Sequence, residues 1–159
     1  MKKHYLLLVL AVLGLTACDP GYDEDVAFKN SSLHVVTVVP SDYYSQYSDT
    51  TVVYENEAHT LAVGEELLLN VAGGLGVASR EEAEGWFRIY YSDSVIFRFD
   101  DEKQVVFYKD DSVSISPYNF NSANYQYEEK LNKGITFHGY PYYGKLTFTI
   151  TDEHYRMAE

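Results

Sequence analysis

Cysteine is nearly absent from this chain, because Cys18 is the only one among 159 residues. No disulfide bond can therefore form within it. Long apolar runs are missing too, since the longest, residues 6–15, holds ten residues. A helix of that length spans about 15 Å, about half of a bilayer's hydrocarbon core, which argues against a transmembrane helix. The composition, 46% hydrophobic and 23% charged, is typical of one folded domain.

Basic side chains are also few, with 12 lysines and arginines against 24 aspartates and glutamates. The net charge of −12 becomes −14 when residues 1–17 are removed, because Lys2 and Lys3 go with them. Phosphate backbones repel such a surface, and no basic stripe is present, so nucleic acid is excluded as a partner. Anionic lipid headgroups repel it as well, so we expect the domain to stand off its membrane.

The first 17 residues have the layout of an export signal: a basic start, the apolar run, and the small residues Thr16 and Ala17. Residues 15–18, Leu-Thr-Ala-Cys, resemble the lipobox of bacterial lipoproteins. The resemblance implies cleavage after Ala17 and a diacylglyceryl group on Cys18, so a membrane is an expected partner. Two or more acyl chains hold a protein firmly. The alternative is a chance cysteine behind an ordinary signal peptide.

Residues 18–25 are expected to be the lipidated cysteine and a short acidic tether, because they lack apolar periodicity. Asp19, directly after the cysteine, resembles a signal for retention at the inner membrane. An acidic stretch at this place also resembles the surface-display signal of the Bacteroidota. A plain solvated spacer is the third alternative.

Residues 26–159 are expected to form one all-β domain, since apolar residues recur with a period of two and long helical periods are missing. Short strands with frequent turns favour a single antiparallel, Ig-like β-sandwich over a barrel. Residues 42–51 are expected to be a loop, residues 79–83 a short helix stopped by Gly85, and residues 151–157 a C-terminal turn. The expected strands are residues 26–30, 33–39, 59–63, 66–71, 95–99, 105–108, 113–115, 135–137 and 146–150.

Motifs of catalysis are lacking, so we expect a non-enzymatic protein without a cofactor. There is no G-x-S-x-G and no H-E-x-x-H, and Cys18 is reserved for lipid. Glu128 and Glu129 cannot flank one glycosidic bond, because neighbours in a strand point to opposite faces. The glycine-rich residues 73–79 lack the spacing of a phosphate-binding loop and predict a bulge or loop.

A weak calcium site is the only metal centre that the sequence suggests. Calcium prefers six to eight oxygen ligands. In a meander of strands, Asp93 returns beside Asp110 and Asp111, and these three carboxylates are the candidate ligands. The alternative is that the three aspartates simply stabilise turns.

Tyrosine is abundant, with 16 residues, and suggests a binding surface. Exposed aromatic rings stack on sugars or anchor protein interfaces at low entropic cost. The alternative is that the rings cover strand faces and close loops onto the core. The candidate ligand-binding residues, all in or beside expected loops, are Tyr118, Tyr125, Tyr127, Tyr140, Tyr142 and Tyr143.

Several segments together resemble a group of small surface lipoproteins of gut Bacteroidota. They are the lipobox with its acidic tether, FKNSS (28–32), SDT (48–50), SVIFRFD (94–100), SPYN (116–119) and LTFTITDEHY (146–155). The resemblance implies display at the outer membrane or cell surface and carries over no catalytic residue. The sequence thus predicts a lipid-anchored binding or adhesion module for glycan or protein. The alternatives are a structural or assembly subunit of an outer-membrane complex or surface filament, and a hydrolase.

Overall fold

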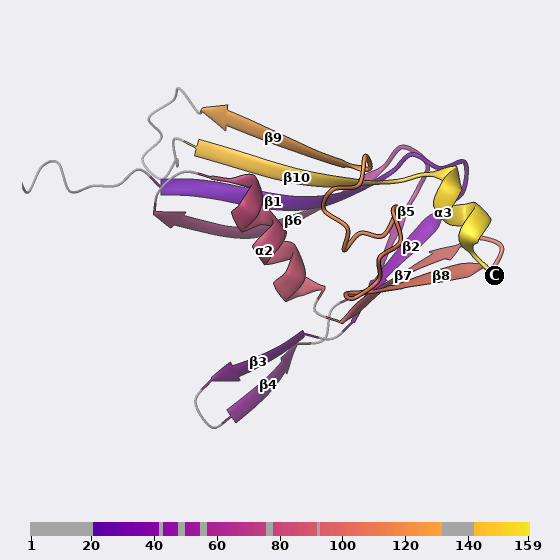
Figure 1. The fold of residues 1–159 in the computed structure, drawn as a ribbon, viewed down its shortest axis with the longest axis horizontal. Coiled ribbons are helices and arrows are strands. Elements are labelled where there is room, and N and C mark those ends of the chain that lie inside the picture. The colour runs from indigo at the N-terminus through magenta and orange to yellow at the C-terminus, as the bar shows by residue number, and fades with distance from the viewer. Residues whose placement is uncertain are drawn as a thin grey trace, which may run out of the picture.

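The computed structural model describes residues 21–41, 43–47, 50–54, 57–75, 78–91, 93–131 and 142–159, and Figure 1 shows their arrangement. Most of them form strands, joined by two helices. The strands are β1 (Gly21–Asn30), β2 (Val36–Pro40), β3 (Tyr43–Tyr47), β4 (Thr50–Tyr54), β5 (His59–Leu61), β6 (Glu66–Leu75), β7 (Ser94–Phe99), β8 (Gln104–Tyr108), β9 (Tyr125–Leu131) and β10 (Tyr142–Ile150), and the helices are α2 (Arg80–Tyr90) and α3 (Asp152–Met157).

The predicted all-β sandwich is confirmed. One sheet has the strand order β6-β1-β10-β9, the other has the order β5-β2-β7-β8, and β3 and β4 pair with each other alone. All neighbouring strands are antiparallel except β1 and β10, which are parallel, with Val26 opposite Leu146 and Phe28 opposite Phe148. No pattern in the sequence predicted this pair. This parallel pair joins the first and the last strand of the fold. All strands of the second sheet lie between them in the sequence.

The core is aromatic and lies between the two sheets. The predicted alternation in β7 is confirmed, because Val95, Phe97 and Phe99 are buried. Phe28 is central, with its ring 5.8 Å from Phe97 and 5.8 Å from Phe148 in edge-on geometry. Such pairs contribute about 0.5–1.5 kcal/mol beyond the burial of their surface. The two sheets are therefore held together by the packing of aromatic rings and not by a disulfide bond.

The predicted helix is confirmed at its start but is longer than expected. The Ser79 hydroxyl accepts a hydrogen bond from the backbone N–H of Glu82 (3.2 Å), which caps the N-terminus. The helix does not stop at Gly85 but continues to Tyr90, because Phe87 and the following Tyr91 are buried against the core. A glycine inside a helix costs about 1 kcal/mol, and the burial of these rings offsets it.

The β1–β2 connection links the two sheets, and residues 33–35 are not strand as expected. The buried Asn30 side chain holds this turn, since its amide donates to the carbonyls of His34 (2.8 Å) and Leu61 (3.1 Å). Its oxygen accepts from the Ser32 backbone N–H (3.0 Å). Leu33 is therefore on the outside of the turn, with 77% of its surface exposed.

Three further expectations require correction. The expected loop 42–51 contains β3 and the start of β4, so much of it is a hairpin. The expected strand 113–115 is irregular, although Ile115 is buried. Residues 135–137 lie outside the described residues, and β9 is an antiparallel partner of β10, with Tyr125 opposite Phe148.

The two ends of the described chain complete the fold. The C-terminal turn is α3, and the Thr151 backbone N–H donates to His154 Nδ1 (3.0 Å) at its start. At the other end β1 begins at Gly21, so residues 21–25 of the expected tether belong to the first sheet. Within the part of the chain that the structure describes, no helix is long and apolar enough to cross a membrane.

Candidate functional site

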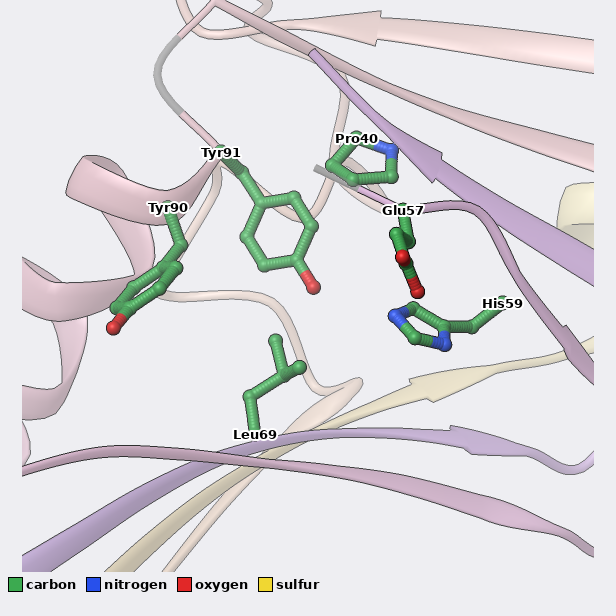
Figure 2. A pocket seen from close by; sticks show the side chains of 6 residues that line it. All are labelled: Pro40, Glu57, His59, Leu69, Tyr90 and Tyr91. Atoms are coloured by element: carbon green, nitrogen blue, oxygen red, sulfur yellow. The ribbon is translucent and has the colours of Figure 1, made fainter. Parts of the chain in front are cut away.

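A small pocket lies at the second sheet, beside the end of β2 and the start of β5, the two strands between which the β3–β4 hairpin is inserted. Pro40 ends β2 before this segment, and Glu57 and His59 follow it at the start of β5. Leu69 of β6 and the two tyrosines at the end of α2, Tyr90 and Tyr91, complete the wall. The cavity measures about 100 Å³. Figure 2 shows these six side chains around it.

Tyr91 is the best-fixed residue of the pocket. Its backbone N–H donates to the Phe87 carbonyl (2.9 Å), and its own carbonyl accepts from the Tyr118 hydroxyl (2.8 Å). Its ring meets Phe28 edge-on at 5.2 Å. Its hydroxyl points into the cavity (Figure 2). Burial, and then the neighbouring Tyr118, raise the pKa of Tyr91 above its usual value, so the hydroxyl stays protonated and can donate a hydrogen bond.

Glu57 and His59 form the opposite wall. They are two residues apart in an extended segment, a spacing that places side chains on the same face. Figure 2 shows the carboxylate and the imidazole at the wall of the cavity across from the tyrosines. The backbone of His59 is held by pairing with Val38 of β2. The pocket therefore combines a carboxylate, an imidazole and a phenol with the apolar surfaces of Pro40 and Leu69.

No sequence pattern identifies the residues of this pocket as a site. They come from four separate elements and fit no motif. The glycine-rich run is not part of the pocket. Its Gly73 and Gly74 belong to β6 and pair with Asp23 and Tyr22.

A second unusual feature is a buried carboxylate, Glu24, in the stretch expected to be tether. Its side chain has 0% of its surface exposed. Its Oε1 accepts hydrogen bonds from the Ser79 backbone N–H (3.0 Å) and the Tyr127 hydroxyl (3.4 Å). Its Oε2 has no partner among the described residues. Burial above all, with the negative charge of Glu82, raises the pKa of Glu24 from 4.5 to about 7.

Gly144 of β10 leaves the space that this cluster fills. A Cβ atom on Gly144 would stand 2.4 Å from the Tyr127 hydroxyl and 3.0 Å from Glu24 Oε1. Only glycine therefore fits opposite the buried carboxylate. No sequence pattern predicts this packing, because acidic residues beside a turn indicate solvent contact.

The structure divides the six candidate tyrosines. Tyr118 and Tyr125 are core residues, so the prediction that they bind a ligand with exposed rings is wrong for these two. Their hydroxyls donate to the carbonyls of Tyr91 and Pro117. These two rings therefore fit the alternative interpretation, in which tyrosines cover strand faces and close loops onto the core.

The structure describes the side chains of two of the other four tyrosines, Tyr127 and Tyr143. Tyr127 is half-buried and contacts Glu24. Tyr143 is half-buried, and burial together with its hydrogen bond to Asp25 raises the pKa of its hydroxyl. Tyr140 and the side chain of Tyr142 lie outside the described residues.

The three calcium candidates do not converge. The Lys109 backbone N–H donates to the Asp93 carbonyl (3.1 Å), so the expected return of the chain beside Asp93 occurs. However, the Asp93 carboxylate pairs with Lys109 Nζ (3.3 Å), and Asp111 Oδ2 accepts from the Tyr108 backbone N–H (2.7 Å). In the described ranges no three His, Cys, Asp or Glu side chains, Asp110 included, are placed to hold a metal ion. The turn-stabilising alternative is favoured.

No protein-family model matches the sequence, and neither a curated protein nor a solved structure is significantly similar to the chain. The fold and the pocket therefore define the protein's class by themselves: a small β-sandwich with a polar, aromatic pocket at the base of a hairpin.

Proposed function

We propose that the chain is a lipid-anchored extracytoplasmic binding protein, attached through Cys18 at the outer membrane or cell surface. Its domain binds a protein or a glycan and does not transform it. The export-type leader and the lipobox resemblance support the anchor. The resemblance to small lipoproteins of gut Bacteroidota supports surface display.

The observation that carries the binding function is the pocket beside the β3–β4 hairpin. The hairpin is hydrogen-bonded to neither four-stranded sheet and extends away from the sandwich (Figure 1). Its sequence holds four tyrosines, Tyr43, Tyr44, Tyr47 and Tyr54. Recognition residues are commonly presented on connecting segments above a rigid scaffold, and tyrosine is the residue most used for such contacts.

The anchor is tested with Cys18→Ala in the full-length chain. We expect this variant to leave the membrane fraction, since no acyl chain can be attached. Mass spectrometry of the wild-type N-terminal peptide should find a modified Cys18 at its first position. An unmodified cysteine or an intact leader in the wild type would contradict the anchor.

The binding function is tested with His59→Ala on protein and glycan arrays. His59 is only half-buried, so the melting temperature should stay close to that of the wild type while retention falls. Glu129→Gln, on the exposed side of β9, is the control and should bind as the wild type does. Equal retention of His59→Ala and wild type would show that the pocket does not take part in binding.

Hydrolysis is the second candidate, and the presence of both Glu57 and His59 in the pocket lining is the observation that favours it. A carboxylate beside an imidazole can activate water as a general base. In that case the wild type should cleave chromogenic esters or glycosides, and His59→Ala should lower the rate by about 10²-fold or more. Equal rates for the two proteins would reject hydrolysis.

Strand addition into a filament is less well supported. Strand β9, at one edge, carries the charged residues Glu128, Glu129 and Lys130. Strand β8, at another edge, exchanges backbone hydrogen bonds of 3.1 Å between Gln104 and the C-terminal Glu159. Charges and covering segments are the usual means by which proteins prevent edge strands from pairing with other chains.

A further inference from the structure

We infer that the pocket accepts the cationic side chain of a lysine or arginine from a protein partner. The inference rests on the proposed binding function and specifies the ligand that the pocket of that function takes. Four properties of the pocket support it: its size, its local charge, its aromatic and apolar walls, and the charge of the whole molecule.

The size favours a side chain over a larger ligand. Pockets for drug-sized molecules measure about 300–1,000 Å³. This cavity measures about 100 Å³. A volume well below that range favours a single side chain over a complete sugar with its hydroxyl groups.

The local charge favours a cation. Glu57 supplies a carboxylate, and none of the six lining residues is a lysine or arginine. Helix α2 ends at Tyr90, with Tyr91 as its C-cap, so its C-terminus lies at the pocket wall. A helix C-terminus carries about half a negative charge, which stabilises cations close to it. Arg88, the basic residue of the last turn, has its guanidinium 4.5 Å from the centre of the Phe120 ring.

The walls suit both parts of a basic side chain. The rings of Tyr90 and Tyr91 offer aromatic surface for a cation–π contact. Pro40 and Leu69 offer apolar surface to the methylene groups of the stem. Lysine and arginine bury such stems readily while the charged end keeps polar partners. The Glu57 carboxylate is the polar partner in reach of the cavity.

The charge of the whole molecule acts in the same direction. The net charge of −12 attracts basic surfaces and speeds their encounter at low ionic strength. It repels anionic ligands, which leaves cationic and neutral groups as candidates. Added salt should weaken the binding of a cationic group and leave a neutral one unaffected.

The test is a titration of the full chain, purified in detergent, followed by NMR of labelled histidine and tyrosine side chains. The probes are the methylamides of Nα-acetyl-lysine and Nα-acetyl-arginine. The neutral comparison is the norleucine derivative, which keeps an apolar stem but lacks the ammonium group. We expect saturable changes at His59 and Tyr91 with the two basic probes alone.

Two variants make the assignment specific. Glu57→Gln removes the carboxylate while keeping its shape and should weaken the binding of both basic probes about tenfold. Glu129→Gln makes the same change of charge on β9 and should leave their affinity unchanged. Glu57 precedes β5 and is exposed, so the variant should fold normally, which the melting temperature checks.

Other results would overturn the inference. Equal affinity for the norleucine and lysine derivatives would exclude a cation site, as would unchanged affinity in Glu57→Gln. A neutral sugar that perturbs His59 more than the basic probes would assign the pocket to a glycan and would keep the proposed binding function. No change with any probe would reject the cation site, while the arrays described above judge the binding function separately.

Discussion

Replacing Glu24 by glutamine should make the protein more stable in mildly alkaline solution and nearly as stable as the wild type in acid. Glutamine has the same shape, and its oxygen can still accept the Ser79 N–H hydrogen bond (3.0 Å). It lacks the charge that Glu24 must carry, fully buried, at high pH. The perturbation therefore removes the cost of burying the charge and little else.

The magnitude follows from the pKa of Glu24, which is 4.5 for the free side chain and about 7 in the folded protein. Between these values the folded state holds a proton that the unfolded state has released, so stability falls as the pH rises through this window. Above about 7 both states are ionised and the loss is complete. At about 1.4 kcal/mol per pH unit over a window of about 2.5 pH units, the loss is at most about 3.5 kcal/mol.

The assay is urea denaturation of wild type and Glu24→Gln at a series of pH values. The difference between the two free energies of unfolding cancels the titration of all other groups. We expect it to be close to zero near pH 4 and to grow to between about 2 and about 3.5 kcal/mol near pH 8. Glu129→Gln should show no such pH dependence. A difference that stays constant across the series would refute the reasoning.

Three further variants test the packing and the caps. Gly144→Ala should lower the free energy of unfolding by about 1–3 kcal/mol, because its Cβ would meet the Tyr127 hydroxyl at 2.4 Å. Adding Tyr127→Phe should recover part of the loss in a double-mutant cycle. Burial lowers the pKa of His154 below its usual value of 6.5, so the folded protein has its full stability above about pH 6.5 and loses part of it as the pH falls. The variant His154→Gln cannot take up this proton, so its melting temperature should fall less in acid than that of the wild type. An equal fall for both proteins would refute this. Ser79→Ala should cost about 1 kcal/mol in urea denaturation through loss of the α2 cap, and no change would show that another group replaces it.

Local patterns were enough to predict much of the second sheet. The alternation of Val95, Phe97 and Phe99 depends on neighbours in sequence. The expected strands 95–99 and 105–108 are present as β7 and β8, which pair with each other. The Ser79 cap was predictable for the same reason, because a cap acts within three residues. The parallel pairing of β1 with β10 depends on residues more than a hundred positions apart, and no local pattern carries it.

The errors arose where tertiary burial outweighs local preference. Gly85 suggested a helix end, but the burial of Phe87 and Tyr91 extends α2 past it. Tyr118 and Tyr125 looked like loop residues and are part of the core. The candidate pocket could not be predicted at all, because the fold alone brings its residues together from β2, β5, β6 and α2.

The early start of β1 has a consequence for how the molecule stands on a lipid surface. Gly21 comes three residues after Cys18, and three residues span at most about 11 Å. With an acyl chain on Cys18, the end of the first sheet at Gly21 would lie within the headgroup region instead of standing clear of it. Strand β1, ten residues or about 33 Å long, would then lift the turn around Leu33 and the start of α3 toward the outside. A patch of lipid rich in negative headgroups would be an unfavourable place for so acidic a neighbour, and the protein would collect where zwitterionic lipids prevail.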